Sequence, residues 1–157
     1  MVQLNFFEQK DFPGVNYALD EDQMRYTATA EQALKKIEER KDTLAFPITI
    51  FEDENPCGFL VLDFGSDKLE LTDNKQAMLL RSFSVNPELQ GKGIGKAAMI
   101  KVDEFVRENF KDCDEIVLAV NQNNIAAYQL YRNTGYHYEG KTKIGRSGPQ
   151  YIMYKKL

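Results

Sequence analysis

The spacing of hydrophobic and polar residues predicts short strands and helices from the first residues onward. Alternation over residues 2–6 predicts a short strand, and an acidic cluster at 20–22 opens a short helix. Apolar residues at i, i+3, i+4 and i+7 then predict a helix from 30 to about 41. Thr29 and Gln32 form a capping-box pattern at its start, in which the two side chains satisfy free backbone amides reciprocally.

The remaining pattern predicts a sheet whose early strands form hairpins and whose later strands alternate with helices. Turn formers at 53–56 and 145–149 mark two hairpin connections. The order of elements predicts an α/β (α+β) fold with a mixed, mostly antiparallel central sheet flanked by helices. The predicted elements are strands at 45–51, 58–64 and 78–85, a helix at 96–109, a strand at 116–120, a helix at 125–133 and strands at 136–139 and 150–154.

Composition narrows the class of protein. The chain has 157 residues, of which 43% are hydrophobic and 28% charged, and these values fit one folded domain over residues 1–157. A net charge of −4 argues against a nucleic-acid binder, which usually has a basic surface stripe. No apolar run reaches the ~18 residues that span a bilayer, and the start lacks the features of a signal peptide. We therefore expect a cytoplasmic protein that binds neither nucleic acid nor a membrane.

Residues that bind metals are few and scattered. The chain has one histidine, His137, and two cysteines, Cys57 and Cys113, which lack the paired spacing of a zinc site. Two distant cysteines are typical of reduced thiols in a reducing compartment. We therefore expect no metal ion.

One short segment has the composition of a phosphate-binding loop. Residues 90–96 read Gln-Gly-Lys-Gly-Ile-Gly-Lys and lie between a predicted strand and a predicted helix. Three glycines in five residues let the backbone approach a ligand closely. The amides and the positive dipole end of the following helix attract anions, and Lys92 and Lys96 add two cations. This combination is suited to phosphate oxygens.

Two common nucleotide-binding motifs do not fit the loop. A P-loop requires G-x-x-x-x-G-K-[ST], but the span from Gly91 to Gly95 is one residue short, and Ala97 stands where the magnesium-binding hydroxyl belongs. A dinucleotide motif G-x-G-x-x-G counted from Gly91 places its third glycine at Lys96. A glycine-rich turn without a ligand stays open as an alternative, because short glycine motifs also occur by chance.

Two segments together resemble one known family. Gln90, Gly93 and Gly95 match the Q/R-x-x-G-x-G/A motif of the GNAT superfamily of acetyl-CoA-dependent N-acetyltransferases. Residues 124–136 resemble the second motif of that family, N-x-x-A-x-x-L-Y-x-x-x-G-F, with Tyr136 in place of the usual Phe. The two motifs stand in the family's order, separated by one predicted helix and one predicted strand.

The resemblance implies how the coenzyme is held. Backbone amides of the glycine loop would bind the pyrophosphate of acetyl-CoA, and the strand before the loop would pair its backbone with the pantetheine arm. The implied coenzyme-binding residues are Phe83, Val85, Gln90, Gly91, Lys92, Gly93, Ile94, Gly95, Lys96, Asn121 and Asn124.

The resemblance also implies how the reaction is catalysed. Tyr131 matches the family's general acid, which protonates the departing thiolate of coenzyme A, and the amide of Val85 would polarise the thioester carbonyl. Asn124 would bond the pantetheine, with Asn121 close by. Structural alternatives stay open, since Tyr131 also fits a core aromatic and Asn124 also fits a helix N-cap.

A general base is missing from its usual place. Many family members have a glutamate on the strand before the loop, but residues 79–82 here read Leu-Leu-Arg-Ser. No base is assigned: the alternatives are a remote acid, such as Glu52 or Glu70, that acts through water, or an amine that arrives already deprotonated. Arg81 is expected to form a structural ion pair or to line the acceptor pocket, because arginine stays charged.

The two motifs together predict an N-acetyltransferase that moves an acetyl group directly from acetyl-CoA to a primary amine of a small molecule or peptide. Neither cysteine lies near a motif, so a covalent intermediate has no candidate nucleophile.

The family builds its acceptor pocket from segments that correspond to 12–29 and 139–151, where Tyr17, Tyr26 and Tyr138 are candidate lining residues. A non-catalytic acyl-CoA-binding or sensing domain and a binder of another nucleotide are the alternatives. An exposed terminal strand is suited to pairing in a homodimer.

Overall fold

The computed structural model describes all residues from Met1 to Leu157 and contains one sheet of seven strands. Their order across the sheet is β1-β2-β3-β4-β5-β7-β6, and all neighbours are antiparallel except β4 and β5. The predicted mixed, mostly antiparallel sheet is therefore confirmed. The strands are β1 (Val2–Phe6), β2 (Ala45–Glu52), β3 (Asn55–Asp63), β4 (Ala77–Val85), β5 (Glu115–Asn121), β6 (His137–Gly145) and β7 (Gly148–Lys156).

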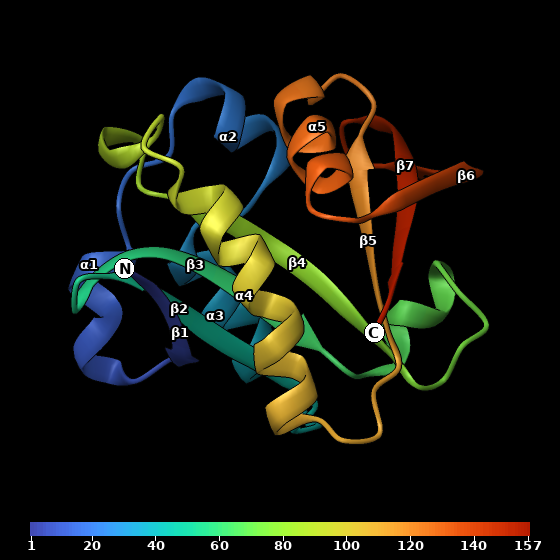
Figure 1. The fold of residues 1–157 in the computed structure, drawn as a ribbon, viewed down its shortest axis with the longest axis horizontal. Helices are drawn as coiled ribbons and strands as arrows, with labels where there is room; N and C mark the ends of the chain where they lie inside the picture. The colour runs from blue at the N-terminus through green and yellow to red at the C-terminus, as the bar shows by residue number, and fades with distance from the viewer.

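Helices cover the two faces of this sheet, and α4 crosses one face in front of β1 to β4 (Figure 1). None of the helices is long and apolar enough to cross a membrane. The helices are α1 (Phe12–Val15), α2 (Glu21–Tyr26), α3 (Ala30–Glu39), α4 (Ile94–Asn109) and α5 (Ile125–Asn133), with short 3-10 turns η1 (Gln9–Asp11), η2 (Ser66–Glu70) and η3 (Pro87–Leu89).

Alternating side chains of β3 divide the core between these two faces. Leu60 and Leu62 belong to a large core of 23 buried residues that includes the inner side of α4. Phe59 and Val61 point the other way and pack with α1 and α3 in a smaller core. Because successive side chains of a strand point to opposite faces, one apolar run such as β3 requires helices on both sides.

The two predicted hairpin connections are shorter in the structure than in the prediction. At the first, only Asp53 and Glu54 form the turn, with φ values of 48° and 73°, and the strand β3 already begins at Asn55. At the second, only Arg146 and Ser147 lie outside the strands. At the first connection, the two positive φ values match the right-handed twist of paired strands. At both connections, the turn formers beyond the two-residue turn continue the ladder.

Strands β4 and β5 separate after a short paired stretch. Their parallel pairing covers only the first residues of each strand, from Ala77 with Glu115 to Leu79 with Val117. Beyond that point β4 has a register shift, with Ser82 at a φ of 57°, and the two strands diverge as a V (Figure 1). A bulge of this kind bends a strand and ends its regular pairing on one side. The opening that results is the centre of the candidate site.

Candidate functional site

A cleft of about 1150 Å³ lies at the V between β4 and β5. Its walls come from α2, η2, β4, the glycine loop, β5, α5 and the end of the β6–β7 hairpin. Lining residues from 79 to 85 of β4 and 118 to 121 of β5 face the opening from its two sides. Ligand sites commonly form where neighbouring strands of a sheet diverge, because backbone groups are left without a strand partner there.

The glycine loop has the local geometry of an anion site. Gly91 and Gly93 both have a φ of 81°, and a Cβ added at either position would meet nothing within 4 Å, so the loop surface is open. Gly93 is the N-cap residue of the 16-residue helix α4 and has no side chain to cap it. The first amides of α4 are therefore free to donate to an anion at its positive dipole end.

The cleft brings together most of the residues that were predicted to form the site. Lys92 and Lys96 are the exceptions: both are exposed beside the loop, and neither lines the cleft. The predicted residues that line it are Phe83, Val85, Gln90, Gly91, Gly93, Ile94, Gly95, Asn121, Asn124 and Tyr131.

Tyr131 on α5 is buried, with 8% of its surface exposed, yet it lines the cleft. Its ring lies 6.4 Å from that of Phe83 on β4 and 5.9 Å from that of Tyr136, measured between centroids. Burial raises the pKa of the Tyr131 hydroxyl above its ordinary value of 10.0. The shift favours the protonated form of the hydroxyl.

The two asparagines have structural partners as well as a place in the cleft. The Asn124 side chain accepts a hydrogen bond from the amide of Ala127 at 3.4 Å, as an N-cap of α5. The Asn121 side chain accepts from the amide of Asn123 at 2.8 Å and donates to the carbonyl of Ser147 at 3.0 Å. The predicted N-cap is confirmed, and both side chains are held in fixed orientations at the end of β5.

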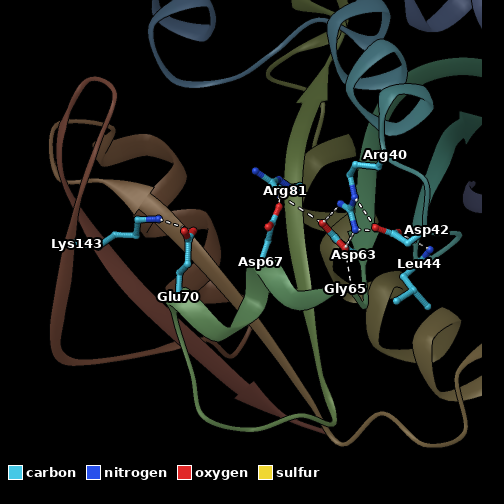
Figure 2. A network of polar contacts seen from close by, with 9 residues as sticks. All are labelled: Arg40, Asp42, Leu44, Asp63, Gly65, Asp67, Glu70, Arg81 and Lys143. Carbon is cyan, nitrogen blue, oxygen red and sulfur yellow. Dashed lines mark hydrogen bonds and ion pairs between the residues drawn. The ribbon is translucent and has the colours of Figure 1, made fainter.

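Arg81 lines the cleft and is held in a network of ion pairs (Figure 2). Its Nη1 lies 2.9 Å from Asp67 and 3.3 Å from Asp63, a carboxylate with 0% of its side chain exposed. Arg40 from the end of α3 also binds Asp63, at 2.6 Å. The expectation of a structural pair for Arg81 is confirmed, and the arginine ties β4 to η2 and β3.

The two carboxylates considered as remote bases lie in different places. Glu70 of η2 lines the cleft and lies 3.2 Å from Lys143 of β6 (Figure 2). Glu52 does not line the cleft, because it pairs with the N-terminal amine at 3.2 Å at the other end of the sheet. Of the two candidates, only Glu70 is within reach of a molecule in the cleft.

Helix α2 bridges the two separated strands. On one side, Gln23 Nε2 donates to the carbonyl of Val85 on β4 at 2.9 Å. On the other, Ser147 Oγ donates to the carbonyl of Arg25 at 2.8 Å, and Ser147 in turn is bound by Asn121 of β5. Gln23 and Arg25 of this bridge also line the cleft. Nothing in the sequence indicates the bridge, because its partners are far apart along the chain.

The three tyrosines proposed to line the acceptor side have different positions. Tyr26 of α2 lines the cleft. Tyr17 does not, but its hydroxyl lies 2.7 Å from the Oγ of Ser84, which does. Tyr138 lies in a smaller separate pocket of about 240 Å³ with Tyr128 and Tyr151. The N-terminal segment and the last hairpin do border the cleft, as expected, mainly through other residues.

Comparison with known proteins gives the family. A model of the acetyltransferase (GNAT) family matches residues 8–136. The uncharacterized N-acetyltransferase YbbJ of Bacillus subtilis (strain 168) is 34% identical over 158 residues, which cover 99% of this chain and 98% of that protein. The spermine/spermidine N(1)-acetyltransferase of the same organism is 28% identical over 112 residues, 71% of this chain and 70% of that protein.

Solved structures share the fold. AAC(6')-Ib in complex with paromomycin and acetyl-CoA superposes with a TM-score of 0.78 at 17% identity, covering 99% of this chain and 93% of that one. The spermidine N-acetyltransferase of Vibrio cholerae in complex with CoA and spermine has a TM-score of 0.72 at 18% identity, with 99% and 95% covered. Because the family model matches most of the chain and a full-length relative exceeds 30% identity, the protein is a member of the acetyltransferase (GNAT) family.

Proposed function

We propose that the protein, as one domain over residues 1–157, transfers an acetyl group from acetyl-CoA to a primary amine of a small molecule or peptide. One observation carries the proposal: a single cleft joins the free amides of the glycine loop to the buried hydroxyl of Tyr131 across the V of β4 and β5. The relatives support the choice of chemistry, since their names include spermine and spermidine N-acetyltransferases.

The coenzyme is assigned to the glycine loop and the adjoining strand. Amides from Gly91 to Lys96 bind the pyrophosphate, where the positive end of α4 favours negative charge. The pantetheine arm lies along the second half of β4, whose backbone has no strand partner toward β5, and reaches Asn124 on the other side. Lys92 and Lys96, exposed beside the loop, contribute positive charge without touching the arm.

The chemistry is assigned to Tyr131 and to direct transfer. The Tyr131 hydroxyl donates its proton to the sulfur of coenzyme A as the thioester breaks, and the amide of Val85 polarises the carbonyl oxygen. A covalent acetyl-enzyme is disfavoured because both cysteines are buried. Burial raises the pKa of the Cys57 thiol to about 11, and it raises the pKa of Cys113, so neither provides a thiolate nucleophile near neutral pH.

Two measurements test this function. Calorimetric titration with coenzyme A, ATP and NAD should show binding of coenzyme A alone, and tight ATP binding without coenzyme A binding would contradict the proposal. A free-thiol assay with acetyl-CoA and a panel of amines should then show turnover. The panel comprises spermine, kanamycin, lysine and a peptide with a free N-terminus. Coenzyme A binding without turnover of any amine favours the alternative, a domain that binds acyl-CoA without catalysis.

A further inference from the structure

After its bulge, β4 presents different side chains to the two faces of the sheet. Phe83 and Val85 lie on the face of the glycine loop, where a Cβ added at Gly95 would meet Phe83 Cζ at 3.7 Å and Val85 Cγ2 at 3.9 Å. Because successive side chains of a strand point to opposite faces, Ser84 points toward α1 and α2. Ser84 is nevertheless among the residues that line the cleft, on the face opposite the loop.

The Ser84 hydroxyl is held by one partner. Its Oγ lies 2.7 Å from the hydroxyl of Tyr17, in the segment between α1 and α2. Either hydroxyl can be the donor, and Ser84 is free to serve the cleft when Tyr17, the more acidic of the two hydroxyls, donates to it. Ser84 Oγ then keeps its own proton and one lone pair for a molecule in the cleft. Because Ser84 is only 6% exposed and lines the cleft, bulk water competes little for this capacity.

Other side chains on this part of β4 are less suited to bind an amine. Arg81 offers only donors, and its guanidinium is already paired with Asp63 and Asp67. Ser82 also lines the cleft but has no hydrogen-bond partner that fixes its rotamer, whereas Tyr17 fixes that of Ser84. A binding group is effective when its orientation is set before the ligand arrives.

We infer that Ser84 Oγ accepts a hydrogen bond from the nitrogen of the acceptor amine and that Tyr17 is the positioning residue that orients this hydroxyl. The inference rests on the proposed function and extends it to the acceptor side. A neutral amine attacks the thioester carbon through its lone pair. When Ser84 holds one N–H of the amine, the lone pair stays free to point at the thioester, which lies along the same strand. Ser84 thus binds the amine, and the amide of Val85, the next residue of β4, binds the thioester carbonyl.

The test compares four proteins: wild type, Ser84→Ala, Tyr17→Phe and Tyr138→Phe. Thiol release is measured with acetyl-CoA and the amine of the panel that wild type turns over fastest, and coenzyme A binding is measured by calorimetry. Ser84→Ala should raise the amine KM and lower kcat, for a loss in kcat/KM on the order of 10-fold or more, with unchanged coenzyme A affinity. Tyr17→Phe should give a smaller loss in the same direction, because the serine hydroxyl remains but rotates freely.

Tyr138→Phe is the matched control, because it removes a tyrosine hydroxyl outside the cleft and should keep wild-type kinetics. Unchanged kcat/KM in both Ser84→Ala and Tyr17→Phe overturns the inference, and so does a parallel loss of coenzyme A affinity, which would place Ser84 with the coenzyme. If Ser84→Ala does not fold, Tyr17→Phe alone decides. Failure of the wild type to bind coenzyme A or to acetylate any amine instead refutes the proposed function.

Discussion

Tyr131 and Tyr136 pack ring against ring, but only one of them reaches the cleft. Both are buried, with 8% and 1% of their surfaces exposed, and burial raises the pKa of each hydroxyl. The Tyr136 hydroxyl has no hydrogen-bond partner, whereas Tyr131 lines the cleft beside Phe83. The two residues therefore allow the effect of a hydroxyl in the cleft to be separated from that of a buried aromatic ring.

Replacement of Tyr131 by phenylalanine should lower kcat by about 10²-fold, because a positioned general acid contributes at least that much. The ring and its packing remain, so the dissociation constant of coenzyme A should stay the same. The matched control is Tyr136→Phe, which removes a buried hydroxyl without a partner and should leave kcat unchanged and stability equal or higher. Equal kcat in wild type and Tyr131→Phe would exclude the acid role.

The raised pKa of Tyr131 also predicts the alkaline side of the pH profile. The acid works in its protonated form, and a pKa above the ordinary value of 10.0 moves the loss of that form to higher pH. We expect no decline of kcat from deprotonation of this residue between about pH 7 and about pH 10. Measurement of kcat at saturating amine over this pH range checks whether the rate stays constant. If kcat declined around pH 8 and Tyr131→Phe abolished this decline, burial would not be what sets the pKa of Tyr131.

At the level of elements, the start of α4 depends on a residue that tolerates positive φ. Gly93 has a φ of 81°, and a Cβ there would meet nothing within 4 Å, so substitution strains the backbone without a clash. Gly93→Ala should destabilise the fold by about 1–2 kcal/mol. It should also weaken coenzyme A binding by about tenfold, since relief of the strain redirects the first amides of the helix.

Gly140→Ala is the control for this effect. Gly140 lies in β6 with a φ of 96° and an equally open surrounding, away from the cleft. A similar loss of stability is expected, measured by thermal unfolding, with no change in coenzyme A affinity. If the two alanine variants bind coenzyme A equally well, the loop amides do not hold the pyrophosphate.

Local sequence patterns predicted the elements better than their connections. The capping pattern at Thr29 and the N-cap at Asn124 involve neighbours along the chain, and the structure confirms both. The contacts of β4 with α2 and with the segment before it were missed because they are non-local. Tyr17 binds Ser84 across 67 residues, and Gln23 binds Val85 across 62. A tyrosine or glutamine in an irregular segment does not indicate which distant strand it will contact, so these parts of the site required the structure.

On the scale of the whole molecule, the cleft requires that β4 and β5 be joined at one end and apart at the other. The network around Asp63 lies at the joined end and links the end of α3, β3, β4 and η2 through Arg40, Arg81 and Asp67 (Figure 2). Asp63 also accepts from the amide of Gly65 at 2.9 Å, which fixes the chain where it leaves β3. We infer that this fully buried carboxylate stabilises the geometry from which the two strands diverge.

Asp63→Asn should therefore cost about 2 kcal/mol of unfolding free energy, because Arg40 and Arg81 lose the buried carboxylate that they share and keep only Asp42 and Asp67 as partners. Urea unfolding measures the loss. The control is Glu104→Gln on the surface of α4, whose side chain is 63% exposed and lies 3.9 Å from Lys101, and it should cost less than about 0.5 kcal/mol. Equal urea midpoints for the two variants would mean that solvent screens the charges around Asp63 as strongly as it screens the surface pair of Glu104 and Lys101. A large loss confined to Asp63→Asn would show that the stability of the fold depends on this one buried charge.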